Sequence, residues 1–377
     1  MNRRHKPTAV KVVNRSKPLI VGFLPENDCA PIVIAQEMGF FRKYGLDVEL
    51  QREMSWKNIH DKIIHRQIHA GQAPAALPFL IHLGLTPEQC DCISGMVLSL
   101  QGNSIAISKA LWNRGVRDAL TLRELITQDR GRRTYSFGVS CPLASPYVLL
   151  CQWLRSADIP PGVEVRIVPG PASQMFPMLK LGYLDGYCAG EPWGTLAVQA
   201  GEGVCVTTST LLAPLHPEKV LLVRKDFAQK NSEQHELLIA ALLEACCFCD
   251  QPQNRNQLCD LLALPHYVNA PVECLEAGLV GQLAPDQSTI HPLHGLHIFH
   301  HYNANEPTSA RAAWITGRLY EFFRWDRRPA SLDHIFRPDI FRRAEKLRIQ
   351  SQTPPPINGE KPTSGHSPEA SELISNP

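Results

Sequence analysis

The sequence predicts an α/β protein with two lobes that close on each other like a clamshell. The first third of the chain reads as alternating strands and helices, and the middle third repeats the same strand–loop–helix plan. The chain has 377 residues, which is too many for one small core and about right for two lobes. In such an arrangement a ligand binds between the lobes, at the carboxyl ends of the strands.

The clearest of these units comes first in the chain. Residues 19–24 form a short apolar run that reads as a strand, and a proline-bounded loop follows it. Pro31 suits the first turn of a helix, and Gly45 ends the segment as a left-handed cap. Residues 46–50 alternate between apolar and charged, as a half-buried strand does. A loop that leads from a strand into a helix N-terminus is a ready anion site, because it offers free amides and a positive dipole end.

The later elements follow from the same periodicities and from cap residues such as Ser55. We predict further strands at 92–99, 104–108, 135–139, 163–168, 183–189 and 219–224. We predict helices at 55–69, 121–129, 147–157, 173–181, 233–249, 254–262, 272–281 and 310–323.

These elements divide the chain into lobes and flanking segments. The residues from 350 onward are rich in Pro, Ser, Gly and Glu, a composition that cannot bury a core. We expect a flexible basic N-terminus at 1–17, a first lobe at 18–108 plus 214–348, a second lobe at 109–213, and a disordered tail at 349–377.

Composition excludes several functional classes. Hydrophobic residues make up 44% and charged residues 20% of the chain, which is typical of a globular protein. The net charge of +2 gives no reason to expect direct nucleic-acid binding, and no apolar run is long enough for membrane insertion. The basic start of the chain lacks the apolar core of an export signal, so we expect a cytoplasmic protein whose 12 cysteines stay reduced.

Several short motifs, in their order and spacing, resemble the nitrate- and bicarbonate-binding components of ABC transporters. The resemblance runs from about residue 19 to about residue 341. It implies a type II periplasmic-binding-protein-like fold that holds a small oxyanion (nitrate, nitrite or bicarbonate) in the cleft. It implies no catalytic residue, no cofactor and no metal. The motifs are GFLP at 22–25, AP at 30–31, GFF at 39–41, GLDV at 45–48, SWKNI at 55–59, CAGEPW at 188–193 and HPEKVL at 216–221, with looser matches WNRGVR at 112–117 and NAN at 303–305.

The resemblance also assigns residues to the cleft. The family's cleft tryptophan falls on Trp56, its Gly-Glu-Pro-Trp motif on residues 190–193, and its cleft lysine on Lys219. A small planar anion needs one cation, several neutral donors and dry aromatic walls, which Lys219 and the two indoles can supply. Glu191 is unusual beside an anion, and it could orient Lys219 or favour a protonated ligand.

This chain departs from the family pattern at two positions. Asn103 stands where the family usually has glutamine, and Pro146 or Tyr147 stands where it has a cleft histidine. Ser145 can still donate a hydroxyl there. The candidate ligand-binding residues are Trp56, Asn103, Ser145, Glu191, Trp193 and Lys219.

The family includes a cytosolic nitrate sensor that sequesters an RNA-binding antiterminator when nitrate is absent. The absence of an export signal makes this chain resemble that branch. The resemblance therefore implies a sensor that regulates nitrate assimilation, with an antiterminator-type regulator as its protein partner. Two alternatives remain open: the substrate-binding component of a nitrate/bicarbonate/taurine-type ABC transporter, and a thiamin-pyrimidine-synthase-like enzyme.

Two other stretches contain residue types that often bind metals. The stretch 291–301 is dense in histidines, but Pro292 and Gly295 break the helix that would align them, so a loop packed on a lobe is favoured. The run Cys-Cys-Phe-Cys at 246–249 resembles one in thiamin-pyrimidine synthases, yet buried thiols on a helix are the favoured interpretation. No Ser-His-Asp arrangement is apparent, and no Walker motif occurs.

Overall fold

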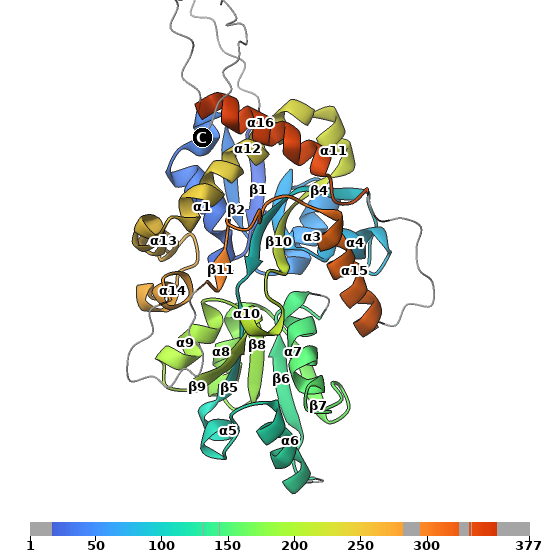
Figure 1. The fold of residues 1–377 in the computed structure, drawn as a ribbon, viewed down its shortest axis with the longest axis vertical. Helices are drawn as coiled ribbons and strands as arrows, with labels where there is room; N and C mark the ends of the chain where they lie inside the picture. Colours follow the sequence, from blue (N-terminus) through green and yellow to red (C-terminus); the bar gives the residue numbers. More distant parts are fainter. Residues whose placement is uncertain are drawn as a thin grey trace, which may run out of the picture.

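The computed structural model describes residues 17–281 except 131 and 143, residues 295–323, residue 332 and residues 334–352. Within these ranges the chain forms two α/β lobes, each built on one twisted sheet, with one lobe above the other in Figure 1. The predicted two-lobed α/β class is confirmed.

The upper lobe in Figure 1 contains a six-stranded sheet in the order β11-β4-β10-β3-β1-β2. Strand β1 pairs in parallel with β2 and β3, whereas β10 is antiparallel to β3 and β4. The strands are β1 (Leu19–Phe23), β2 (Val48–Arg52), β3 (Ala70–Pro74), β4 (Cys92–Gln101), β10 (Pro217–Arg224) and β11 (His297–Ile298).

The lower lobe contains a five-stranded sheet in the order β7-β6-β8-β5-β9, in which β5 is antiparallel to both of its neighbours. Its strands are β5 (Asn103–Ser108), β6 (Tyr135–Val139), β7 (Val165–Pro169), β8 (Gly186–Gly190) and β9 (Gly203–Thr208). Its helices are α5 (Lys109–Asn113), α6 (Ala119–Gln128), α7 (Ser145–Arg155), α8 (Ala172–Lys180), α9 (Trp193–Gln199) and α10 (Ser209–Leu212).

Helices cover both faces of the upper sheet, because successive strand residues point to opposite sides. In β10, Leu221 and Val223 pack into the cluster formed with α1 and α12, while Val220 and Leu222 pack toward α3 and α4. The helical segments of this lobe are η1 (Asn27–Cys29), α1 (Ala30–Glu37), α2 (Phe40–Lys43), α3 (Trp56–Ile64), α4 (Leu77–His82), α11 (Lys225–Lys230), α12 (Ser232–Asp250), η2 (Pro252–Asn254), α13 (Arg255–Leu262), α14 (Val272–Leu279), α15 (Ser309–Phe323) and α16 (Pro338–Gln352).

The chain first crosses between the lobes at Gly102, whose φ of +102° lies in the region that glycine tolerates. The segment 103–108, which the sequence assigned to the first lobe, pairs with β8 and β9 of the second sheet. The predicted boundary after residue 108 is therefore one strand too late. An apolar run shows that a strand is present but not which sheet it joins. The chain returns between α10 and β10.

The boundary of the predicted tail is also corrected. Helix α16 continues to Gln352, and the hydroxyls of Ser351 and Tyr44 are 2.8 Å apart, so residues 349–352 belong to the folded first lobe. The rest of the predicted tail and residues 1–16 lie outside the described residues.

The two candidate metal clusters have different outcomes. His291 and His294 lie outside the described residues, and His297 is buried in β11. Cys246 and Cys249 are buried in α12, where burial raises the pKa of both thiols. In the part of the chain that the structure describes, no group of three or more His, Cys, Asp or Glu side chains is placed to hold a metal ion. Within the same ranges, no helix combines the length and apolar character needed to cross a membrane.

Candidate ligand-binding site

The lobes meet where several segments begin or end: the loop after β1, the end of β8, and the starts of β5 and β10. The backbone N–H of Asn27 donates to the carbonyl oxygen of Glu191 across this junction at 2.7 Å. The indole Nε1 of Trp193 donates to the carbonyl oxygen of Pro25 at 3.1 Å. The two lobes are therefore in direct contact around the candidate site.

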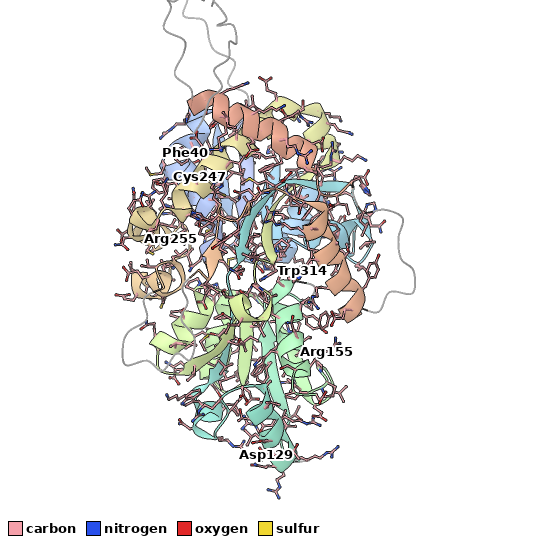
Figure 2. All side chains as sticks on the ribbon, viewed as in Figure 1. Phe40, Asp129, Arg155, Cys247, Arg255 and Trp314 are labelled. Carbon is pink, nitrogen blue, oxygen red and sulfur yellow. The ribbon has the colours of Figure 1, made fainter. Side chains whose placement is uncertain are left out.

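Helix α15 adds a second contact between the lobes. Figure 2 shows Trp314 of α15 close to the level at which the lobes meet, with Arg155 of α7 below it. The Arg155 guanidinium carbon lies 4.3 Å from the centroid of the Phe322 ring, and its Nη1 lies 3.5 Å from Glu321 Oε1. These contacts join the outer edge of the second lobe to the first.

Lys219 is the charged centre of the junction. Its Nζ lies 2.7 Å from Asp28 Oδ2 and 2.8 Å from Glu218 Oε1. Glu26 Oε2 is 3.2 Å from the same nitrogen, and the centroid of the Trp56 ring is 5.1 Å from it. All five side chains are buried. The sequence predicted a lysine whose charge was available to an anion, whereas the structure offsets that charge with three carboxylates.

Local backbone geometry explains why Glu218 and Lys219 can both face this centre. Adjacent residues of a regular strand point to opposite faces. The pairing of β10 with β4 shifts register on both sides of Lys219, where the partner residue is Ser99. Such an irregularity changes the direction of a side chain. The acid and the ammonium group therefore meet within one strand.

The loop after β1 is held from the neighbouring strand. Gln72 of β3 accepts from the backbone N–H of Leu24 at 3.0 Å through Oε1. Its Nε2 donates to Asp28 Oδ1. This loop was predicted as a free anion site, but its two carboxylates, Glu26 and Asp28, give it acidic character instead.

Glu218 is held by side chains from both places where the chain passes between the lobes. Its Oε2 accepts from Asn103 Nδ2 at 2.7 Å and lies 2.8 Å from His216 Nε2. His216 Nδ1 lies 2.8 Å from the carbonyl oxygen of Ala213. Because a carbonyl and a carboxylate both accept, this geometry suits a His216 imidazole that donates from both nitrogens.

The three carboxylates differ in protonation. Burial raises the pKa of Glu26 to about 7, against the lowering effect of Lys219. Burial also raises the pKa of Asp28. Burial opposes the ionisation of Glu218 too, but Lys219 and His216 outweigh it and lower its pKa to about 2. Glu26 therefore changes charge near neutral pH.

Lys219 stays charged. Burial alone would lower its pKa, but Asp28, Glu218 and Glu26 together raise the pKa of the ammonium group well above its usual value. One charged ammonium group therefore faces three buried carboxyl groups.

Glu191 is buried, but its partners differ from those expected. Its Oε1 accepts from the Ser104 hydroxyl, and its Oε2 accepts from the backbone N–H of Thr195 at 2.9 Å. Burial raises the pKa of its carboxyl group. The expectation that Glu191 orients Lys219 is not met, because these bonds are made within the second lobe.

Ser145 lies at a different point of the junction. It is buried at the start of α7 and lines a cavity of about 10 Å³. Ala75 and Pro217 of the first lobe form part of the wall. A space of this size holds at most one water molecule. Tyr147, two residues further along α7, packs against Phe322 with a centroid distance of 6.5 Å.

Several buried polar atoms near Lys219 have no hydrogen-bond partner within the described protein. They are Glu26 Oε1, both side-chain atoms of Asn27, Ser99 Oγ and Asn103 Oδ1. An unsatisfied buried polar group costs about 1–3 kcal/mol. Most of these atoms can only accept, so the junction suits a small bound group that can donate a hydrogen.

The sequence predicted that Trp56, Asn103 and Lys219 lie in one site, but it did not predict most of the residues that they contact. His216 and Glu218 lie within the matched HPEKVL motif, so the motif itself carried that signal. The acidic residues at 26 and 28 were visible in the first loop, but their approach to β10 depends on strand pairing that the sequence does not state.

These features define a two-lobed binding domain of the periplasmic-binding-protein type. The crystal structure of the periplasmic nitrate-binding protein NrtA from Synechocystis PCC 6803 matches it with a TM-score of 0.80 and 25% identity, over 91% of this chain and 92% of that chain. The aliphatic sulphonate binding protein SsuA from Escherichia coli shares the fold, with a TM-score of 0.62 and 14% identity over 87% and 100% of the two chains.

The sequence profile of the NMT1-like family matches residues 14–263, and the chain belongs to that family. It is 34% identical over 334 residues to the nitrate import ATP-binding protein NrtC of Synechocystis sp., covering 86% of this chain and 49% of that protein. It is 32% identical over 383 residues to the bicarbonate transport ATP-binding protein CmpC of Synechococcus elongatus, covering 96% and 56%.

The chain thus spans about half the length of these curated relatives. It is a substrate-binding domain related to the binding proteins of nitrate and bicarbonate ABC transporters. That part of the resemblance is confirmed, as is the periplasmic-binding-protein-like fold.

We predict that Glu26→Gln changes how stability depends on pH. A carboxyl group whose pKa rises from 4.5 to about 7 on folding favours the folded state below pH 4.5, and this contribution is lost as the pH rises through 7. Relative to the variant, the wild-type free energy of unfolding should therefore fall between pH 5 and pH 8, by up to about 3 kcal/mol.

Urea denaturation at both pH values, in degassed buffer, measures this difference. Glu49→Gln makes the same change of charge on the exposed face of β2 and serves as the control. If Glu26→Gln and wild type show the same pH dependence, Glu26 does not titrate near neutrality and the assignment is wrong.

Proposed function

We propose that this domain binds a small oxyanion beside Lys219, and that bicarbonate fits the site better than nitrate. The observation that carries the proposal is the set of unpaired acceptor atoms on Glu26, Asn27 and Asn103 around a lysine that is already matched to carboxylates. The relatives NrtA and CmpA, named for binding nitrate or nitrite and bicarbonate respectively, support a ligand of this class.

The Lys219 ammonium group has three N–H donors, and three carboxylates surround it. An incoming oxyanion must therefore share or replace one of these contacts. Glu26 has the longest of them, and burial raises its pKa to about 7. Glu26 is thus the carboxylate that yields its contact at the lowest cost.

Nitrate and bicarbonate differ in what they offer to Glu26. Nitrate carries only acceptor oxygens, so it would face an ionised Glu26 as a like charge. Bicarbonate has one O–H, which can donate to the Glu26 carboxylate while its other oxygens accept from Lys219. A hydrogen bond to a charged group contributes about 1.5–3 kcal/mol, which is enough to decide between two planar anions of similar size.

We predict that Glu26→Gln reverses this preference. The variant removes the negative charge and supplies an amide N–H, so nitrate affinity at pH 8 should rise by roughly tenfold or more while bicarbonate affinity falls. Isothermal titration calorimetry with bicarbonate, nitrate and nitrite measures both effects.

Glu49→Gln is again the matched control and should leave all three affinities unchanged. The ligand assignment is abandoned if wild type binds none of the three anions, or if Glu26→Gln weakens nitrate and bicarbonate equally.

We further propose that the domain reports ligand occupancy rather than only capturing the ligand. This chain contains no Walker motif, and it matches about half of NrtC and about half of CmpC. The matched half is therefore not the nucleotide-binding part of those proteins. A ligand-binding domain with this relation to ATP-binding proteins suits a sensor in the cytoplasm. The sensor would be read by transporter subunits or by an antiterminator-type regulator.

The hydrogen bond between Asn27 and Glu191 offers a physical route for this readout, because it joins the two lobes and would break if they moved apart. A coupling of about 1–3 kcal/mol changes partner affinity by roughly 5- to 150-fold. Affinity capture from cytosol, with and without bicarbonate, should recover a partner in ligand-dependent amounts. Recovery that does not depend on the anion would contradict the sensor role.

A further inference from the structure

The sulfur atoms of Cys90 and Cys92 lie 3.2 Å apart at the start of β4. We propose that these two residues form a redox-active dithiol, which closes to an internal disulfide by exchange with a small-molecule disulfide such as oxidised glutathione. This inference does not depend on the identity of the ligand at Lys219.

The geometry needs little adjustment to form the bond. A disulfide has an S–S length of about 2.05 Å, so the sulfur atoms must approach each other by roughly 1 Å. Cys92 is the first residue of β4, where its backbone pairs with Arg224 of β10. Cys90 lies in the preceding loop, outside the strand, while the carbonyl oxygen of the intervening Asp91 accepts from the Lys225 N–H at 2.7 Å, so the movement falls to Cys90 itself.

One of the two thiols is open to a reagent. Cys90 is half-buried and lines a cavity of about 640 Å³ together with Asp91, Arg224 and Lys225. Cys92 is buried behind it. Asp226 also lines this cavity, so the cationic Arg224 and Lys225 are balanced by two acidic side chains, and access rather than charge distinguishes the two thiols. The arrangement therefore presents Cys90, rather than Cys92, to an incoming disulfide.

The two thiols also differ in pKa, and the difference has the direction that disulfide exchange requires. The hydrogen bond from Cys92 lowers the pKa of Cys90, and the Arg224 guanidinium adds to this effect. The same hydrogen bond, together with burial, raises the pKa of Cys92. The thiolate is the attacking species in disulfide exchange, so Cys90 is the nucleophile and Cys92 the resolving thiol.

The reaction balances as two successive exchanges. The Cys90 thiolate attacks one sulfur of RSSR and forms a mixed disulfide, releasing RS⁻. Cys92 then loses its proton and attacks the Cys90 sulfur, which releases the second RS⁻. The two protons lost by the cysteines are taken up by the two thiolates. Two protein thiols and one RSSR thus become one protein disulfide and two RSH.

The dithiol contacts a part of the core that reaches the ligand site. Cys92 belongs to the buried cluster that also contains Trp56, Ile59, Ile63 and Leu222, and Cys90 packs against this cluster. The Trp56 ring of the same cluster lies beside Lys219. The disulfide would therefore form on a layer continuous with one wall of the site.

The test uses the full chain and a single tryptic peptide. Cleavage after Arg66 and after Lys109 releases residues 67–109, which contain Cys90 and Cys92 and no other cysteine. The folded protein is incubated with oxidised glutathione, alkylated and digested. We expect this peptide to be lighter by two hydrogen atoms and to carry no alkyl group.

Single variants separate the roles of the two thiols. Cys92→Ser should trap glutathione on Cys90 about tenfold faster than Cys90→Ser traps it on Cys92, because the thiolate fraction and the access both differ. Cys247→Ser removes a half-buried thiol of α12 and should leave disulfide formation unchanged.

The proposal is overturned if wild-type peptide 67–109 stays fully alkylated under conditions that glutathionylate Cys247. It is also overturned if Cys90→Ser and Cys92→Ser react at the same rate. Because the wild-type peptide mass is itself decisive, a variant that fails to fold does not remove the test.

Discussion

The ion cluster around Lys219 is the interaction on which the rest of the junction depends. One buried ammonium group faces carboxylates from the loop after β1 and from β10 itself. Removing one partner from a buried ion pair costs about 3–5 kcal/mol, because the remaining charge stays buried and unpaired. Segments almost two hundred residues apart in sequence are therefore fixed to each other at the point where the lobes meet. A substitution at Lys219 would disturb this packing as well as any ligand.

The same cluster restricts what can bind. An anion that only accepts hydrogen bonds gains little from a lysine whose donors are already matched, and ionised Glu26 repels it. A ligand with its own O–H satisfies an orphaned acceptor instead. Protonation of Glu26, whose pKa burial raises to about 7, relieves the repulsion in another way. Ligand choice and pH are therefore linked through one side chain.

Much of the fold could be predicted from the sequence, because strand and helix periodicity is a local property. The Ser55 cap is confirmed by its 3.2 Å bond from the Asn58 N–H, and the left-handed Gly45 by its φ of +70°. Sheet membership is not local, and the strand 103–108 was therefore assigned to the wrong lobe. Helix α16 was not among the predicted helices, and the tail was therefore started at residue 349, inside it.

The site was predicted less completely than the fold. Trp56 and Lys219 were found through motifs, and the structure places them together. The charge balance could not be found in this way, because it arises when strand pairing brings the first loop beside β10. Ser145 was placed by alignment with a missing histidine, and the structure puts it in a separate small cavity. Motifs thus identified which residues lie near the junction but not which groups they face.

At this junction an oxyanion must be accompanied by a hydrogen, brought either by the ligand or by Glu26. Calorimetry at pH 8 in two buffers of different ionisation enthalpy counts the protons exchanged on binding. We expect nitrate binding to take up about one proton per molecule and bicarbonate binding to take up none. Tight nitrate binding without proton uptake would contradict this expectation.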